Sequence, residues 1–234
     1  MTETFEQIMR QIDQNIQRIR SQIADAATAA GRQSDAVTLM AVTKGFPSPY
    51  AAEAARRGIS VFGENRVQEA LTKAAALPNL RWEMIGTLQR NKVKSAVKVF
   101  QRIQSIDSIE LALALNAAAQ TLQQPLEVFV QVNISGEATK HGVQPELALQ
   151  LGEAIQSLPY LRGGGLMTVA PFAENPQTIR WVFAELRALR DSFQAHFGDS
   201  WQDLSMGMSH DFAAAIAEGA TLVRIGSALF GGRK

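Results

Sequence analysis

Over most of its length, the sequence alternates between short apolar runs and longer stretches with helical periodicity. Eight runs have the length and composition of buried strands: Val37–Val42, Ile59–Phe62, Arg81–Ile85, Arg102–Ile106, Leu126–Val132, Leu161–Met167, Asp203–Met206 and Leu222–Ile225. Helical patterns lie between them, near Pro49–Arg57, Asn65–Ala76, Gln89–Phe100, Ile109–Thr121, Pro145–Ser157, Pro176–Ala195 and His210–Glu218. Eight such repeats in about 200 residues is the count of a (β/α)8 TIM barrel, which is the α/β fold that we predict.

The main alternative is an open, doubly wound sheet, which usually carries a glycine-rich phosphate-binding fingerprint after its first strand. Here the first strand ends in Thr43-Lys44-Gly45, and no GxGxxG pattern occurs. The segment from Gly58 to Gly63 resembles the start of a P-loop, but Glu64 stands where the lysine belongs. We interpret this segment as a buried strand flanked by turns.

A further helix is predicted in front of the barrel. Thr4 with Gln7 matches a capping box, and Gly31 is a suitable stop. One apolar stripe runs along this helix, made of Ile8, Ile12, Ile16, Ile19 and Ile23. We therefore expect one domain over residues 1–234, with the helix over 1–31 and the barrel over 37–234.

Composition excludes several classes of function. Lys and Arg number 23 against 22 Asp and Glu, so charge gives no reason to expect nucleic acid or an anionic membrane as a partner. The absence of cysteine excludes disulfides, thiolate metal sites and a cysteine nucleophile. His141, His196 and His210 lie at no metal-ligand spacing, so we expect no metal. No apolar run suits a signal peptide or a membrane helix of ~20 residues, so we expect a cytoplasmic protein.

In a barrel of this kind, the functional site lies at the carboxyl ends of the strands, and the loops after strands 7 and 8 often hold a phosphate. Those loops begin with Gly207-Met208-Ser209 and with Gly226-Ser227, which offer hydroxyl groups and unhindered backbone N–H groups. Either serine could instead cap its own helix and bind nothing, because Ser is a preferred N-cap. The coincidence of both loops gives a phosphate site the same weight as two ordinary caps.

Lys44 follows the first strand directly, where its ammonium would point into the barrel mouth. Most lysines are solvated surface groups, but a partly desolvated lysine has a lowered pKa and is suited to Schiff-base formation. A phosphate cradle beside such an amine suggests an aldehyde phosphate, for which pyridoxal 5'-phosphate (PLP) is the simplest candidate.

Arg224 lies within the eighth strand among apolar neighbours and needs a partner, because a buried unpaired charge is costly. A structural carboxylate such as Asp203 is one candidate. The pyridine nitrogen of the cofactor is the other. A guanidinium there would keep the ring nitrogen unprotonated and so weaken the ring as an electron sink.

Seven ordered motifs resemble those of the pyridoxal phosphate homeostasis proteins (YggS/PROSC type) over nearly the whole chain. They are Ala41-Val42-Thr43-Lys44, Phe62-Gly63-Glu64-Asn65 with Val67-Gln68-Glu69, Ile85-Gly86-Thr87-Leu88-Gln89-Arg90-Asn91-Lys92, Gln131-Val132-Asn133-Ile134-Ser135, Gly165-Leu166-Met167, Leu204-Ser205-Met206-Gly207-Met208-Ser209 and Thr221-Leu222-Val223-Arg224-Ile225-Gly226.

The resemblance implies a fold-type III barrel like the N-terminal domain of alanine racemases, with PLP on Lys44. It also implies Ser209, Gly226 and Ser227 at the phosphate, Arg224 near the pyridine nitrogen, and Asn65 and Met167 near the ring. Lys140 matches a second lysine thought to take part in cofactor exchange. Three positions depart from the pattern: Gly45 for a common Thr, Arg66 for Tyr, and Glu83 for His. Glu83 places a carboxylate near the end of strand 3, where no role of the family histidine can be carried over.

Two classes of function remain open. A PLP-dependent racemase needs a base on each face of the substrate, commonly a lysine and a tyrosine that comes from a second domain and a partner subunit. Only nine residues follow Ile225, and the two tyrosines, Tyr50 and Tyr160, lie at no strand's carboxyl end. We therefore expect no enzyme. The resemblance implies a protein of PLP homeostasis that stores, delivers or buffers the cofactor, with effects on amino-acid and keto-acid balance and with PLP-dependent apoenzymes as its partners.

Overall fold

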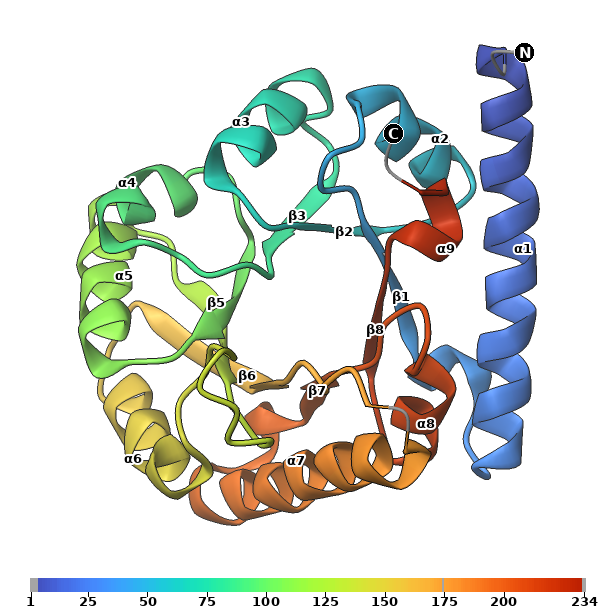
Figure 1. The fold of residues 1–234 in the computed structure, drawn as a ribbon. Coiled ribbons are helices and arrows are strands. Elements are labelled where there is room, and N and C mark those ends of the chain that lie inside the picture. Colours follow the sequence, from blue (N-terminus) through green and yellow to red (C-terminus); the bar gives the residue numbers. More distant parts are fainter. Residues whose placement is uncertain (1–3, 174, 233–234) are drawn as a thin grey trace.

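The computed structural model describes residues 4–173 and 175–232 and shows a closed barrel of eight parallel strands in sequence order (Figure 1). Each strand pairs with the next, and β8 returns to pair with β1. The strands are β1 (Thr38–Val42), β2 (Val61–Glu64), β3 (Arg81–Met84), β4 (Arg102–Ile106), β5 (Leu126–Gln131), β6 (Leu161–Met167), β7 (Asp203–Ser205) and β8 (Leu222–Ile225). The predicted barrel is confirmed, and the open sheet is excluded.

Helices surround the barrel (Figure 1). They are α1 (Phe5–Ala29), α2 (Ser48–Arg56), α3 (Val67–Ala76), α4 (Val93–Ala96), α5 (Ile109–Leu122), α6 (Pro145–Gln156), α7 (Pro176–Phe197), α8 (Phe212–Ala217) and α9 (Ser227–Phe230). The helix expected over 89–100 was too long: a 3₁₀ turn at Arg90–Lys92 leads into only four α-helical residues. Val93, Ala96 and Phe100 are nevertheless buried, so this short segment still covers its side of the barrel.

Two other boundaries differ from expectation. Strand β2 extends through Gly63 and Glu64, and both are fully part of the buried strand. Asn65 and Arg66 stay outside α3, because Arg66 has extended backbone angles as its N-cap residue. In α2, Ser48 is already helical and Pro47 occupies the cap position, so the helix begins one residue earlier than predicted.

Helix α1 lies along the outside of the barrel against α2, α8 and α9 (Figure 1). The predicted capping box is present: Gln7 N–H donates to Thr4 Oγ1, and Thr4 N–H donates to Gln7 Oε1. Its buried stripe consists of Ile12, Ile16, Ile19, Ile23 and Ala27. The helix is thus a built-in part of the wall that carries the first and last elements of the barrel.

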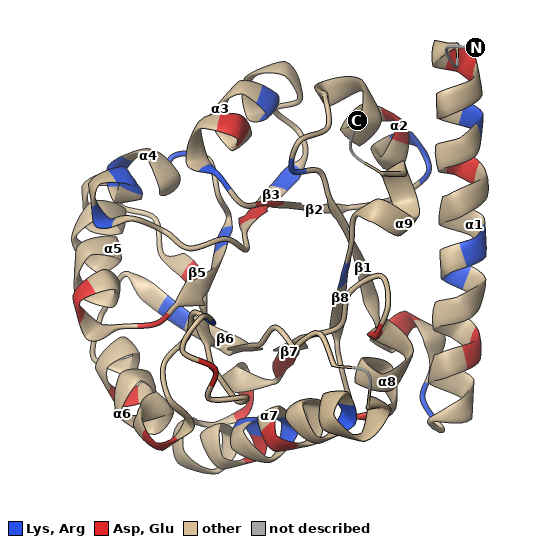
Figure 2. Ribbon diagram, in the orientation of Figure 1, with Lys and Arg blue, Asp and Glu red and all other residues tan. Residues whose placement is uncertain are grey.

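The barrel interior is half apolar and half charged. Met40, Val42, Val61 and Leu222 form a small apolar cluster with Ile85 packed against it. Strands β3 and β4 contribute buried arginine, glutamate and glutamine side chains instead. Figure 2 shows residues of both charges on the strands of the barrel as well as on the outer helices. Most of the hydrophobic core therefore lies outside the strands, between the barrel and its helices.

Strand β6 contains three consecutive glycines. A Cβ atom at Gly163 would lie 1.9 Å from Cζ2 of the buried Trp201, and one at Gly165 would lie 2.2 Å from the carbonyl oxygen of Asp203. Glycine is therefore required for the wall to close against Trp201 on the outside and against β7 at its side. None of the described helices is long and apolar enough to cross a membrane.

Candidate cofactor site at the carboxyl ends of strands 1 and 8

A cavity of about 250 Å³ opens at the carboxyl ends of β1 and β8. Five of the predicted site residues line it together: Lys44, Ser209, Arg224, Gly226 and Ser227. The remaining lining residues are Val42, Phe46, Ile85, Met208, His210 and Gly231. Lys44 and Arg224 are cationic, and none of the described lining residues is acidic, so the cavity suits an anionic ligand with an apolar body.

The backbone around Lys44 is held by a buried ionic cluster beneath it, consisting of Glu64, Glu69 and Lys73, which we call the Lys73 cluster. The Lys73 ammonium donates to Glu64 Oε1 at 2.6 Å, to Glu69 Oε1 at 2.7 Å and to the Thr43 carbonyl oxygen at 2.6 Å. These three acceptors match its three N–H bonds. The residue that precedes Lys44 is thereby tied to a buried charge.

Two further contacts complete this support. Thr43 Oγ1 donates to Glu64 Oε1 at 2.5 Å, and Gly45 N–H donates to Glu69 Oε1 at 2.6 Å. Burial raises the pKa of Glu64, although hydrogen bonds and the charge of Lys73 oppose that effect. The sequence motifs included Glu64 and Glu69, but Lys73 was missed. Its position on the same helical face as Val67 and Ala70 was the available signal.

The two predicted phosphate loops meet at their serines. Ser227 Oγ donates to Ser209 Oγ at 3.3 Å, and the N–H of Ala228 donates to Ser209 Oγ at 3.4 Å. Neither serine is the N-cap of its own helix: Asp211 is the N-cap residue of α8 and Gly226 that of α9, and neither caps its helix with a side chain. The alternative role as ordinary N-caps was therefore wrong.

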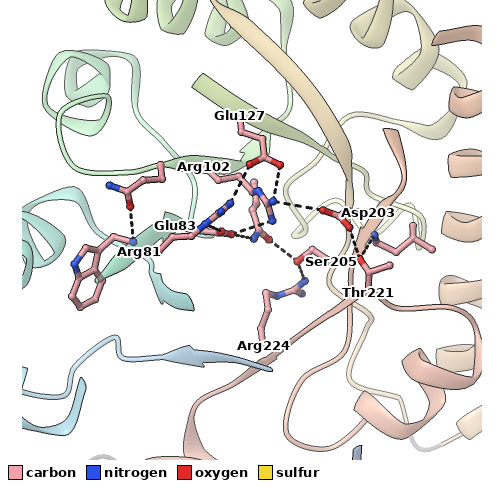
Figure 3. Close-up of polar contacts among 12 residues, drawn as sticks. Arg81, Glu83, Arg102, Glu127, Asp203, Ser205, Thr221 and Arg224 are labelled. Carbon is pink, nitrogen blue, oxygen red and sulfur yellow. Dashed lines mark hydrogen bonds and ion pairs between the residues drawn. The ribbon is translucent and has the colours of Figure 1, made fainter. Parts of the chain in front are cut away.

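Arg224 is buried, and its partners are neutral. Its Nη1 donates to Ser205 Oγ at 2.8 Å, and its Nη2 donates to the Thr168 carbonyl oxygen at 2.7 Å (Figure 3). Asp203, one of the two candidate partners, does not pair with Arg224, because it contacts Arg102 and Thr221 instead. Burial lowers the pKa of Arg224 to about 10, while the charge of Asp211 opposes that effect. A guanidinium this deeply buried, with no direct carboxylate partner among the described residues, is poised for a further acceptor.

Glu83 lies inside the barrel rather than at its mouth. Its Oε1 accepts from Arg81 Nε at 2.8 Å, and its Oε2 accepts from Gln104 Nε2 at 2.6 Å (Figure 3). Arg102 Nη1 lies 3.6 Å from Oε2. Burial raises the pKa of Glu83 against the opposing charges of Arg102 and Arg81. This interior network was missed by sequence reasoning, which placed Glu83 only near the strand end.

Asn65 and Met167 do not line the cavity. Met167 is fully buried at the end of β6, next to the Thr168 carbonyl that Arg224 binds. The Asn65 Oδ1 atom is buried without a hydrogen-bond partner among the described residues, which is unusual for a polar atom. Lys140 donates to the Ala170 carbonyl oxygen at 3.4 Å, in the loops after β5 and β6. Among the described residues, no group of three His, Cys, Asp or Glu side chains could hold a metal ion.

Comparisons with known proteins agree on one family. Residues 10–234 match the family described as alanine racemase, N-terminal domain. The chain is 42% identical to the pyridoxal phosphate homeostasis protein of Aquifex aeolicus over 223 residues, covering 94% of this chain and 98% of that one. It is also 42% identical to the protein of the same name from Pseudomonas aeruginosa, over 96% of this chain and 97% of that one.

Solved structures share the fold of this chain. PipY of Synechococcus elongatus with PLP bound superposes with a TM-score of 0.82 at 35% identity, covering 94% of this chain and all of that one (100%). Alanine racemase of Clostridium difficile superposes with a TM-score of 0.75 at 18% identity, and the match covers 92% of this chain but 56% of the racemase. This second likeness concerns the fold alone.

Proposed function

The chain belongs to the family of pyridoxal phosphate homeostasis proteins, and on that premise we propose that it binds PLP in the cavity at β1 and β8 and stores, delivers or buffers it. The observation that carries the proposal is the meeting of Lys44, Arg224 and the two serine loops around one cavity with no acidic lining among its described residues. PLP is a phosphate ester with an aldehyde and an aromatic ring, and the cavity offers one feature for each part.

Lys44 holds PLP covalently in this proposal, through condensation of its amine with the aldehyde, and the Lys73 cluster fixes the backbone that presents that amine. Ser209, Ser227 and the backbone at Gly226 hold the phosphate. Arg224 faces the ring nitrogen. Because a guanidinium with a pKa of about 10 stays protonated near neutral pH, it donates a hydrogen bond there and accepts no proton. When bound, PLP would supply an electrophilic aldehyde and an electron-withdrawing ring. Because Arg224 leaves the ring nitrogen unprotonated, the ring would withdraw electrons less strongly.

Asn65 and Met167 are proposed to lie near the ring. The buried, unpartnered Oδ1 atom of Asn65 supports this for Asn65. For Met167, the support is its place beside Thr168, whose carbonyl binds Arg224. Lys140, on the loop after β5, is proposed as a second amine that helps the cofactor leave the site.

We propose a carrier rather than an enzyme. Racemisation needs a second acid/base group opposite the lysine, and neither Tyr50 nor Tyr160 lines the cavity; Tyr50 stacks on Phe46 and contacts Phe230. His210 does line the cavity, so a racemase remains the second candidate. Incubation of the PLP-loaded protein with each alanine enantiomer separates the two. We expect no change in optical purity, whereas racemisation at enzyme-like rates would overturn the carrier proposal.

The recipients proposed for PLP are cytoplasmic PLP-dependent apoenzymes. Transfer is measured by mixing the loaded protein with an apoenzyme and following the recovery of its activity.

The first test of the proposal is covalent capture. Purified protein incubated with PLP should turn yellow, and borohydride should then fix the cofactor on Lys44, identified by peptide mass. Lys44→Ala should lose the yellow colour yet retain PLP more weakly through the phosphate. Lys140→Ala is the matched control and should be labelled at Lys44 as the unmodified chain is. A protein that takes up no PLP would contradict the proposal.

A further inference from the structure

The hydrogen bonds inside the barrel form a chain with a single direction, running from Arg224 to Glu83. Arg224 has only donors, so its Nη1 donates to Ser205 Oγ at 2.8 Å. The Ser205 hydroxyl donates onward to Gln104 Oε1 at 2.5 Å, and Gln104 Nε2 donates to Glu83 Oε2 at 2.6 Å. Each donor points toward Glu83, and hydrogen bonds aligned in this way strengthen one another in a dry interior.

The chain crosses the barrel rather than following its wall (Figure 3). Arg224 and Ser205 come from the neighbouring strands β8 and β7, while Gln104 and Glu83 come from β4 and β3 on the other side. Gln104 and Ser205 are both fully buried. One end of the chain is in the cofactor cavity, which Arg224 lines, and the other is at the buried carboxylate.

Glu83 determines the direction of the chain. Both of its oxygens accept hydrogen bonds, one from Arg81 Nε and one from the Gln104 amide nitrogen, and these two nitrogens can only donate. A carboxylate that accepts from Gln104 turns the amide so that its oxygen faces Ser205. The Ser205 hydroxyl must then donate to that oxygen, which leaves its lone pairs for Arg224. With a neutral residue at 83, the Gln104 amide could reverse and donate to Ser205. The Ser205 hydrogen would then lose its place on Gln104, and only one Ser205 lone pair would be left for Arg224, so its direction would no longer be fixed.

The interior charges are balanced with Glu83 in place. Arg81, Arg102 and Arg224 equal Glu83, Glu127 and Asp203 in number, and each of these carboxylates contacts Arg102 within 3.6 Å. Glu127 resembles Glu83 in charge and in its partners, since it also pairs with Arg81 and Arg102. It differs in having no contact with Gln104, which makes it a matched control.

We propose that Glu83 is a positioning residue for the cofactor site, acting through Gln104 and Ser205 to fix the orientation of Arg224. This inference rests on the proposed binding of PLP, and its effect would be on the affinity for PLP and on the electrostatics around its ring. Glu83, which two residues separate from Arg224, would thereby determine how the Arg224 guanidinium is oriented in the cavity.

The test compares Glu83→Gln with Glu127→Gln, both titrated with PLP as the full apo-chain. We expect Glu83→Gln to weaken PLP binding about tenfold, the effect of losing one well-placed hydrogen bond to a charged group. We also expect the pH midpoint of the visible band of Lys44-bound PLP to move upward by about 0.5 or more, because a displaced Arg224 no longer disfavours a positive charge nearby. Glu127→Gln should leave both quantities unchanged.

A swapped variant tests the direction of the chain. Glu83→Gln with Gln104→Glu keeps the same residues but moves the carboxylate one hydrogen bond closer to Ser205, where it again forces the hydroxyl to donate. This double variant should recover the pH midpoint and most of the affinity. If Glu83→Gln fails to fold, Ser205→Ala is titrated in its place. It removes the acceptor of Arg224 Nη1 without changing any charge, so it should shift the affinity for PLP and the pH midpoint in the same directions.

Three results would overturn the inference: equal effects of Glu83→Gln and Glu127→Gln, no recovery in the swapped variant, or a Ser205→Ala variant with the wild-type midpoint and affinity. Failure of the unmodified chain to bind PLP would instead count against the proposed function itself. The two failures are therefore distinguishable in one titration series.

Discussion

At the scale of single residues, the site depends on charges buried around Lys44 rather than on Lys44 alone. The Lys73 cluster carries two carboxylates and one ammonium, and Glu64 is its most deeply buried member. Because burial raises the pKa of Glu64 above its ordinary value of 4.5, the folded protein holds a proton there at a pH where the unfolded chain has released it. The stability from this proton is complete below about pH 4.5, the unfolded value, and is lost as the pH rises through the folded pKa.

We therefore expect the stability difference between the unmodified chain and Glu64→Gln to change in favour of the unmodified chain as the pH falls from 7 toward 4.5. Urea unfolding at several pH values measures this difference. Glu185→Gln, an exposed substitution on α7, controls for the loss of one carboxyl group. A difference that shrinks with falling pH would mean that the fold stabilises the ionised form of Glu64.

Sequence reasoning recovered five of the residues that line the cavity but not those that hold them. Lys44, Ser209, Arg224 and Ser227 stand at strand ends, a position that can be read along the chain. Lys73 and Gln104 act through partners on other elements, so their roles depend on which strands and helices are neighbours and in what register. The candidate pairing of Arg224 with Asp203 failed for the same reason, since Asp203 on β7 meets Arg102 on β4, a strand far from it in the sequence.

At the scale of elements, α1 supports, from outside the barrel, the part of the site where we propose that the phosphate binds. Asn15 Nδ2 donates to the Leu229 carbonyl oxygen at 2.9 Å, and Arg18 Nη2 donates to the Ala228 carbonyl oxygen at 3.2 Å. Both acceptors belong to α9, whose first residue is Ser227. Helix α1 thus anchors the short helix that carries one of the two serines.

Asn15→Ala should weaken PLP binding about threefold, the worth of one ordinary hydrogen bond. Equilibrium titration of the apo-protein with PLP measures the change. Arg20→Ala is the control, because Arg20 Nη2 donates from the same helix to the Gly58 carbonyl oxygen at 3.0 Å, away from α9. Equal losses in both variants would show a general loosening of α1 instead of a specific anchor.

The elements themselves were predictable where local pattern decides them. All eight strands were found because a strand buried on both faces is a nearly continuous apolar run. Strand β2 was placed too early and ended too soon, because Gly63 and Glu64 are turn-like and charged when taken alone. Glu64 is acceptable in the strand only because Thr43 and Lys73 satisfy it, and no local signal contains that information.

At the scale of the whole molecule, the barrel should gain stability when the cofactor binds, because the cavity is built from the first and the last strand, β1 and β8. PLP at a hundred times its dissociation constant should add ~2.7 kcal/mol. For a protein of this size, that corresponds to a rise in Tm of roughly 5–10 °C. Scanning calorimetry should show one transition that moves as a unit, and Lys44→Ala should show a smaller rise. Two separate transitions, with only one shifted by PLP, would contradict a single cooperative barrel.

The pairing of β8 with β1 has a consequence for how the protein is made. Lys44 leaves the ribosome early, whereas Ser209, Arg224 and Ser227 follow only after some 165 to 183 further residues of synthesis. Until the last strand emerges from the exit tunnel and pairs with β1, the nascent chain carries the Lys44 amine without the groups proposed to bind the rest of PLP. The complete set of groups proposed to bind PLP therefore comes together only once β8 has paired with β1.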